Sequence, residues 1–331
     1  MASTGKAFCS VACGIMLDEH RDSIPEGLDT KVFTPEYLPA AFPLDDQRKA
    51  DISLGQLLCM TAGYHGEGVA PGVVHGKTHP LKAVMNSTFE LPIDAALGLQ
   101  RGGNLQDISQ LDMSSITAPL WTAPGGGYSY SSPSPHVASI VLREVTGMDL
   151  KDYIDEKLAK PMGWGAWDYC HRWDVPSNGA GSIAVRATDA LRFGYCLLRS
   201  GRWGEKQLVP PDYVKACGTP SPYNPHAPFS LQFEHNADWH VAGAPTDAFW
   251  KSGAGGFCLY VVPSLDLVIY KLGGATIGQY YPAATGVTPP QPFDSCDSSR
   301  DDWEPAEEGP FVDAAGSLTR VLEMVAAAVT D

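Results

Sequence analysis

Three short stretches of the chain carry residue types that can activate a nucleophile. Ser3 and Lys6 lie three positions apart in the stretch Ser3-Thr4-Gly5-Lys6, where a predicted helix begins. Side chains at this spacing are neighbours on one helix face, so the lysine amine can reach the serine hydroxyl. A hydroxyl beside an amine is the arrangement that a serine nucleophile needs. Serine and threonine are also ordinary helix-start residues, and that explanation suffices for this stretch taken alone.

The second stretch is a glycine-rich loop, residues 124–132, which contains Tyr130. Pro133 and Pro135 follow it and are expected to delay the next helix until about His136. A tyrosine on such a loop can face a cleft and transfer a proton when cations lie nearby. A tyrosine packed among other apolar side chains is the alternative, and it is preferred for a lone tyrosine.

The third stretch runs from Trp250 through Lys251, Ser252 and Gly253 to Gly256. Lys251 falls within a β-rich run, where a charged side chain faces either solvent or a site. The glycines allow a ligand or another part of the backbone to approach closely. A solvated lysine at a strand edge accounts equally well for this stretch by itself.

Composition narrows the classes of partner. The chain has 331 residues, of which 44% are hydrophobic and 18% charged, as expected of a globular protein with a substantial core. Its formal net charge of -15 argues against nucleic acids and anionic membranes, because phosphate groups are bound by clustered lysines and arginines. No apolar run is long enough to span a membrane. We therefore expect small molecules or proteins as partners, and composition leaves the oligomeric state open.

Cysteines and short motifs narrow the chemistry further. The eight cysteines form no C-x-x-C pair, and in a chain of this length they indicate buried free thiols in a reducing compartment, which predicts a cytoplasmic location. The nine histidines are not spaced like metal ligands. G-x-S-x-G, H-E-x-x-H and G-x-G-x-x-G are absent, and Gly76-Lys77-Thr78 lacks the upstream glycine of a P-loop. We expect neither a metal nor a cofactor.

Hydrophobic periodicity predicts the elements that must position these residues. The first helix is expected to bury one face and to end near residues 18–21. Ser53 and Gln56 form a capping box for the next helix, which Gly63 is placed to end. Later helices are predicted over residues 136–146, 150–160, 188–201 and 318–325. β-rich runs at 249–253, 257–262 and 267–272 predict an antiparallel meander, and the proline-rich acidic segment 278–310 predicts a long surface loop or mobile insertion.

Together, the three stretches resemble the motifs of the serine β-lactamase and penicillin-binding-protein superfamily: S-x-x-K, Y-x-N or its variants, and K-[ST]-G. Here they read Ser3-Thr4-Gly5-Lys6, Tyr130-Ser131-Ser132 and Lys251-Ser252-Gly253, in the family's order. Connecting segments are similar to the family's at residues 34–39, 52–63, 147–163 and 202–209. They resemble most the branch that holds class C β-lactamases, D-amino peptidases and family VIII carboxylesterases.

The resemblance implies an α+β fold of the β-lactamase type over residues 1–331, with an antiparallel sheet flanked by helices from both chain ends. A mostly helical subdomain is expected over 20–227, and the sheet part with the final helix over 228–331, interrupted by the insertion 278–310. Family members carry two strands before the nucleophile. These N-terminal strands are expected to be missing here, which would leave the strand at 267–272 as an unpaired apolar edge.

By the same resemblance, Ser3 would be the acylated nucleophile, Lys6 its base, and Tyr130 the relay of the proton to the leaving group. The backbone N–H groups of Ser3 and Ala254 would form the oxyanion hole. Lys251, Ser252 and Gly253 would set the local field and orient the substrate.

The resemblance also bears on substrate choice. Ser132 would line the substrate site where the family often has asparagine, so small esters or amides are favoured over β-lactams and peptides. Trp250, together with Tyr64 and Trp121, would form an apolar pocket, with a role as core aromatic residues as the alternative for Tyr64 and Trp121.

The expected function is therefore hydrolysis of a small ester or amide through an acyl-enzyme, as in carboxylesterases. β-Lactamase or D-amino peptidase activity is one alternative. The other alternative is a truncated, non-catalytic relative that uses the cleft as a binding surface. Catalysis requires a nucleophile held within narrow tolerances, and Ser3 lies close to the start of the chain.

Overall fold

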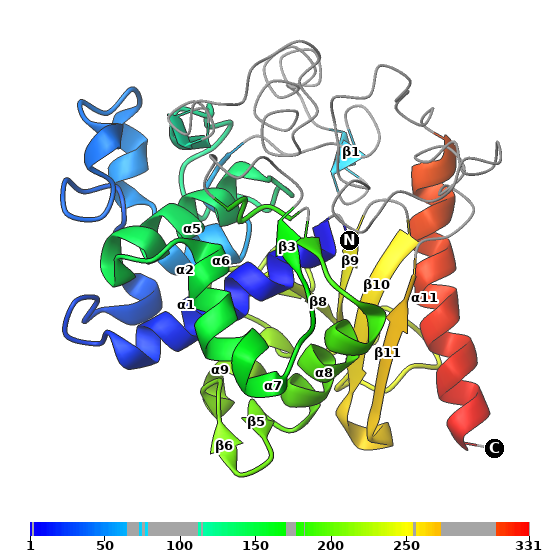
Figure 1. The fold of residues 1–331 in the computed structure, drawn as a ribbon. Helices are drawn as coiled ribbons and strands as arrows, with labels where there is room; N and C mark the ends of the chain where they lie inside the picture. Colours follow the sequence, from blue (N-terminus) through cyan, green and yellow to red (C-terminus); the bar gives the residue numbers. More distant parts are fainter. Residues whose placement is uncertain are drawn as a thin grey trace, which may run out of the picture.

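The fold is known from a computed structural model (Figure 1). It describes residues 1, 3–64, 73–74, 77–78, 112–113, 115–169, 177–181, 183–253, 256–272 and 309–330. The described α-helices are α1 (Lys6–Glu19), α2 (Leu54–Leu58), α5 (Pro133–Thr146), α6 (Leu150–Ile154), α7 (Lys160–Met162), α8 (Ala187–Leu198), α9 (Pro211–Cys217) and α11 (Gly309–Thr330). Short 3-10 turns are η1 (Ser3–Gly5), η2 (Gly27–Asp29), η3 (Pro39–Ala41), η4 (Gln47–Asp51) and η7 (Pro263–Leu265), and η5 (Asp155–Ala159) is a π-helical turn.

The main sheet is antiparallel and has the strand order β11-β10-β9-β8-β7. Its strands are β7 (Phe229–Ser230), β8 (Phe233–His235), β9 (Phe249–Gly253), β10 (Phe257–Val262) and β11 (Leu267–Lys271). The predicted meander is confirmed, since β9, β10 and β11 pair in succession. Three two-stranded ribbons pair β1 (Val73–Val74) with β2 (Lys77–Thr78), β3 (Asp168–Tyr169) with β4 (Ile183–Ala184), and β5 (Arg202–Trp203) with β6 (Lys206–Gln207).

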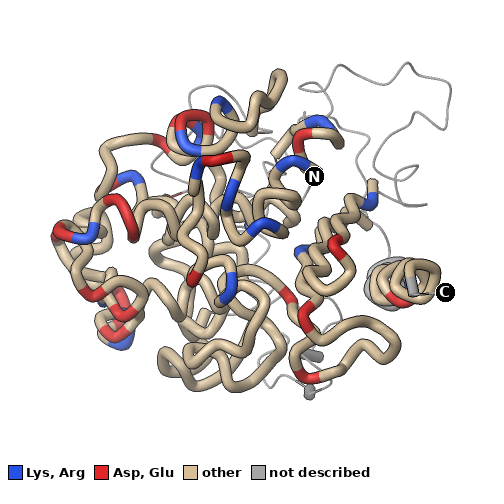
Figure 2. The backbone as a smooth tube through the Cα atoms, turned by 90° about the horizontal axis from the view of Figure 1, so that it is seen from below, with Lys and Arg blue, Asp and Glu red and all other residues tan. Residues whose placement is uncertain are grey.

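Helices cover both faces of this sheet. α11 stands against one face and is seen nearly end-on beside the strands in Figure 2. There, Leu318 and Leu322 pack with Trp250, and the Tyr260 hydroxyl donates to the Leu318 carbonyl at 3.0 Å. On the other face α8 approaches closely at Gly194, where an added Cβ would lie 2.5 Å from Val268 Cγ1. The prediction that the final helix packs on the sheet is confirmed.

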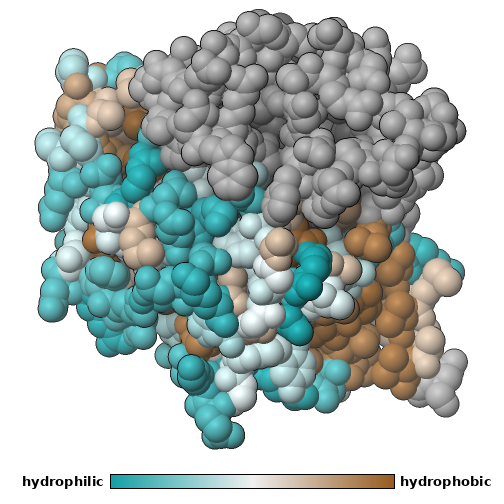
Figure 3. Space-filling view, viewed as in Figure 1, coloured by the Kyte–Doolittle hydropathy of each residue, from teal (hydrophilic) through white to brown (hydrophobic). Residues whose placement is uncertain are grey.

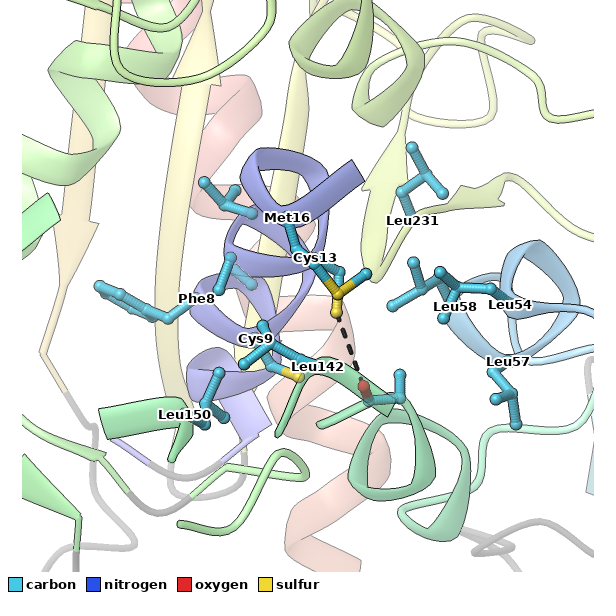
Figure 4. Close-up of a cluster of buried hydrophobic side chains, with 14 of the residues drawn as sticks. Phe8, Cys9, Cys13, Met16, Leu54, Leu57, Leu58, Leu142, Leu150 and Leu231 are labelled. Carbon is cyan, nitrogen blue, oxygen red and sulfur yellow. Dashed lines mark hydrogen bonds between the residues drawn. The ribbon is translucent and has the colours of Figure 1, made fainter. Parts of the chain in front are cut away.

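α1 lies in the interior rather than at the surface. All residues from Lys6 to Met16 are buried, so the expectation that this helix buries only one face is wrong. α1 packs against α5, α6 and α9, and Figure 4 shows Phe8, Cys13 and Met16 of α1 with Leu142 of α5 and Leu150 of α6 nearby. A helix enclosed on every side has no polar face, because every position must be apolar, small or hydrogen-bonded.

Two helix boundaries also differ from expectation. α5 begins at Pro133, not near His136, because the first-turn N–H groups of a helix have no intrahelical partner and proline loses nothing there. The capping box of Ser53 and Gln56 is present, but α2 ends at Leu58, before Gly63. The predicted insertion 278–310 lies almost entirely outside the described residues, which resume with α11.

β11 forms one edge of the described sheet, and its residues Leu267–Lys271 are half-buried. In Figure 3 brown, hydrophobic residues gather over β10, β11 and the adjoining α11. Leu272, just after β11, has 57% of its surface exposed. Within the described part of the chain, no helix is long and apolar enough to cross a membrane.

Candidate active site

The start of α1 brings Ser3 and Lys6 together. The Lys6 Nζ lies 2.9 Å from Ser3 Oγ, 3.1 Å from Ser132 Oγ and 2.6 Å from the Ala180 carbonyl oxygen. Lys6 is fully buried, so these contacts satisfy an amine that has no access to water. The contacts with Ala180 and Ser132 hold the amine within hydrogen-bonding distance of the Ser3 hydroxyl.

Sequence reasoning missed the segment that supplies Ala180. Asn178 shapes it, because its Oδ1 accepts a hydrogen bond from the Ala180 N–H at 2.9 Å. The segment also packs tightly on η1, since a Cβ added to Gly5 would lie 3.0 Å from the Gly181 Cα. A backbone carbonyl acceptor leaves no residue-type signal, and only the small residues 179–181 hint that two backbones meet there.

Tyr130 lies between the two lysines. The Lys251 Nζ donates to the Tyr130 hydroxyl at 3.2 Å, and the Lys6 Nζ lies 5.0 Å from the centroid of the tyrosine ring. Lys251 is fully buried and also lies 4.8 Å from that centroid. It is therefore not a solvated lysine on a strand edge. Amines on both sides would stabilise negative charge that develops on the phenol oxygen.

Met60 holds the Tyr130 loop on both sides, and sequence reasoning also missed it. Its carbonyl oxygen accepts from the Ser129 N–H at 3.0 Å, and its Sδ accepts from the Ser131 N–H at 3.0 Å. The two bonds flank Tyr130 along the chain. Met60 itself is buried and has a left-handed φ of 61°, an uncommon conformation for a residue other than glycine.

Gly253 lies against Ser3 and Thr4. A Cβ at this position would be 2.6 Å from Thr4 Oγ1 and 3.1 Å from the Ser3 backbone nitrogen. Only glycine therefore lets the end of β9 come this close to η1. Ala254, the other residue expected at the oxyanion hole, lies outside the described residues.

Trp250 and Ser252, the neighbours of Lys251 on β9, point toward the opposite face of the sheet. Trp250 packs against α11 with Cys258 and Tyr260, on the opposite sheet face from Lys251. The structure thus does not bring Trp250 to Ser3. Ser252 shares that face, and its Oγ donates to Glu234 Oε1 at 2.6 Å. Of the other two aromatic residues, Tyr64 is buried in the main core and Trp121 packs beside Gly127.

The thiols of Cys9 and Cys13 follow Lys6 along α1, but neither is arranged as a nucleophile. A hydrogen bond with Cys13 and burial hold the pKa of Cys9 well above its usual range, so this thiol stays protonated. Six of the cysteines are buried and free, as predicted: Cys9, Cys13, Cys59, Cys196, Cys217 and Cys258. Among the described residues, no group of three His, Cys, Asp or Glu side chains is placed to hold a metal ion.

Comparisons with known proteins identify the family of this chain. A family model described as Beta-lactamase matches residues 1–273, most of the chain, and the chain therefore belongs to the beta-lactamase family. Members of this family are generally serine hydrolases, and the fold is β-lactamase-like, with helices around antiparallel sheets. A search of curated proteins finds no match.

Solved structures share the fold at low sequence identity. A putative 6-aminohexanoate-dimer hydrolase from Bacillus anthracis is 18% identical with a TM-score of 0.64, over 98% of this chain and 73% of the other. EstCE1, described as a hydrolase with promiscuous acyltransferase activity, is 17% identical with a TM-score of 0.61, over 90% and 84%. A mutant of simvastatin synthase (LovD) from Aspergillus terreus is 14% identical with a TM-score of 0.60, over 100% and 82%.

Proposed function

We propose that this protein is a serine hydrolase that cleaves a small ester or amide through an acyl-enzyme attached to Ser3. The observation that carries the proposal is the position of the Lys6 amine, 2.9 Å from Ser3 Oγ and buried away from solvent. A serine hydroxyl beside a desolvated amine can lose its proton as it attacks a carbonyl carbon.

The proposed reaction has two halves. Ser3 Oγ attacks the carbonyl carbon while Lys6 takes the hydroxyl proton, and the Ser3 N–H, with that of Ala254, stabilises the oxyanion. Tyr130 then delivers a proton to the leaving alcohol or amine, and the acyl-enzyme remains. Water attacks this acyl group, the released proton returns through the same groups, and the carboxylic acid leaves.

Ser132 supports esters and small amides over β-lactams. Its hydroxyl lies 3.1 Å from the Lys6 amine, and it is buried. A hydroxyl engaged in this way offers less than the two N–H donors and one acceptor that an asparagine amide would present to an acylamide substrate.

The test compares the protein with Ser3→Ala on short p-nitrophenyl esters, and measures intact mass after exposure to a fluorophosphonate. We expect hydrolysis and a single adduct with the protein, and neither with Ser3→Ala. Ser23→Ala is the matched control, because Ser23 is an exposed serine outside the site. Equal hydrolysis by the protein and Ser3→Ala would refute the Ser3 assignment.

Two further substrates separate the alternatives. A chromogenic β-lactam and a D-amino acid p-nitroanilide test β-lactamase and D-amino peptidase activity, and we expect turnover of both to be slower than that of the esters. Absence of both hydrolysis and adduct would favour a non-catalytic protein that uses the cleft for binding.

A further inference from the structure

The carbonyl group that holds Lys6 belongs to a short turn, residues 178–181. Two hydrogen bonds close this turn: the Gly181 N–H donates to the Asn178 carbonyl oxygen at 3.2 Å, and the Ala180 N–H donates to Asn178 Oδ1 at 2.9 Å. Across a trans peptide bond the carbonyl and the N–H point in opposite directions. Since the Gly181 N–H faces into the turn, the Ala180 carbonyl faces outward, where the Lys6 amine lies 2.6 Å away.

Close packing places a flexible residue inside this turn. A Cβ added to Gly179 would lie 2.4 Å from the Pro135 carbonyl oxygen, so only glycine fits here. Glycine leaves the adjoining peptide groups more freedom to rotate than any other residue does. The Asn178 side chain restrains this freedom, because its oxygen holds the N–H of the peptide that joins Gly179 to Ala180.

The side chain of Asn178 contributes its oxygen alone. The residue is 2% exposed, and its Nδ2 atom is buried without a hydrogen-bond partner among the described residues. A buried donor that stays unpaired costs free energy, so stability by itself does not account for an amide at this position. The bond that the amide does make is the one that orients the turn toward Lys6.

A short series of contacts connects Asn178 with the proposed nucleophile. Asn178 orients Ala180, whose carbonyl oxygen contacts Lys6 Nζ. The same Nζ lies 2.9 Å from Ser3 Oγ. A lysine amine ends a flexible four-carbon stem, so its position depends on the groups that it contacts. A displacement of about 1 Å near reacting groups can lower a rate about 100-fold.

We propose that Asn178 is a positioning residue: through the Ala180 carbonyl, its side-chain oxygen holds the Lys6 amine where it can take the proton of Ser3. The inference rests on the proposed function, since it assumes that Ser3 is acylated with Lys6 as its base. Loss of the oxygen slows acylation of Ser3 and leaves substrate affinity nearly unchanged. Ser132, 3.1 Å from the same amine, keeps the loss partial.

The test uses two variants that differ from each other by one hydroxyl group. Asn178→Ala removes the acceptor, whereas Asn178→Ser returns one, because a serine hydroxyl can bond to the backbone N–H two residues later. Both variants shorten the side chain, so they lose similar packing. The readouts are kcat and KM for a short p-nitrophenyl ester, the rate at which a fluorophosphonate forms its adduct with Ser3, and thermal unfolding.

We expect Asn178→Ala to lower kcat and the labelling rate about 10- to 100-fold, with KM changed by less than about twofold. Asn178→Ser should be at least about fivefold faster than Asn178→Ala, the factor that one neutral hydrogen bond supplies. Both variants should unfold at similar temperatures, because they lack the same packing.

Asn236→Ala is the matched control. Asn236 is also a buried asparagine whose Oδ1 accepts from the backbone, at the Val241 N–H. Its own N–H donates to the Ala248 carbonyl, just before β9 begins, at the end of that strand away from Gly253. Asn236→Ala should therefore lower thermal stability and leave kcat unchanged.

The outcomes are distinguishable. An unchanged kcat in Asn178→Ala, a change in KM alone, or equal rates for Asn178→Ala and Asn178→Ser would each overturn this inference, while hydrolysis that depends on Ser3 would leave the proposed function intact. If Asn178→Ala does not fold, Asn178→Leu, which also lacks an acceptor, replaces it. Absence of both hydrolysis and adduct in the unaltered protein would overturn both proposals together.

Discussion

The Lys251 amine lies 3.2 Å from the Tyr130 hydroxyl, although 121 positions separate the two residues along the chain. β9 supplies the lysine, and the loop before α5 supplies the tyrosine. The contact joins the sheet to the helical part of the chain, near the place where η1 runs into α1. The contact places a buried amine beside the hydroxyl to which we assign proton transfer.

Tyr130→Phe should lower kcat for ester hydrolysis about 10²- to 10³-fold, because it removes a proposed proton relay and the partner of Lys251. The ring contact with Phe229, at 6.2 Å between centroids, can remain, so little change in unfolding is expected. Steady-state kinetics and thermal unfolding measure the two effects. Tyr128→Phe is the control, since Tyr128 also packs on Phe229. An active Tyr130→Phe would exclude the phenol from proton transfer.

Gly253→Ala should abolish activity, because the new Cβ would lie 2.6 Å from Thr4 Oγ1 and 2.8 Å from the Thr4 nitrogen. The clash pushes η1 away from β9 and should cost about 1–3 kcal/mol of stability. Gly27→Ala provides the contrast, because Gly27 has a positive φ but no atom within reach. It should cost about 1 kcal/mol and leave kcat unchanged. Activity retained in Gly253→Ala would show that the approach of β9 to Ser3 is not needed.

Met60→Leu should destabilise the protein by about 1–3 kcal/mol, because the buried Ser131 N–H loses its sulfur acceptor while side-chain volume is nearly kept. Since Ser131 follows Tyr130 directly, kcat should fall more than KM changes. Urea unfolding and steady-state kinetics provide the measurements. Unchanged values for both would mean that the loop is held by its other contacts, including the bond of Ser129 to the Met60 carbonyl.

His235 should make stability fall in mild acid. Burial lowers its pKa below the usual value of 6.5, and among the described residues neither ring nitrogen has a hydrogen-bond partner. Above pH about 6.5 the imidazole is neutral in both states and stability is full; below it, the unfolded chain binds a proton that the folded state refuses, and stability declines until the pH reaches the folded pKa. The free energy of unfolding should therefore fall between pH 7 and 5.

His235→Leu removes this proton linkage and should flatten the decline between pH 7 and 5, measured by urea unfolding at several pH values. The free energy of unfolding of each protein is compared with its own value at pH 7. A packing change caused by the substitution then shifts all values of that protein equally and does not alter the slope with pH. Parallel pH profiles for the two proteins would show that His235 does not cause the acid sensitivity.

The sequence by itself determined the local elements with strong periodicity and the residue types of the site. The three strands of the meander and the final helix follow from patterns that each short segment carries within itself. Ser3 and Lys6 were also within reach of prediction, because helical spacing fixes their neighbourhood whatever surrounds the helix.

Tertiary structure decided the contacts between segments that lie far apart in the sequence. It enclosed α1 on all sides, brought the Ala180 carbonyl to Lys6, set Met60 beside the Tyr130 loop, and turned Trp250 toward α11 while Lys251 faced the site. Backbone acceptors and the choice of strand face depend on which segments pack together, and a strand pattern does not state which of its two faces meets the site. The bond of Ser252 to Glu234 is of this kind, since the two residues meet only because β8 and β9 pair.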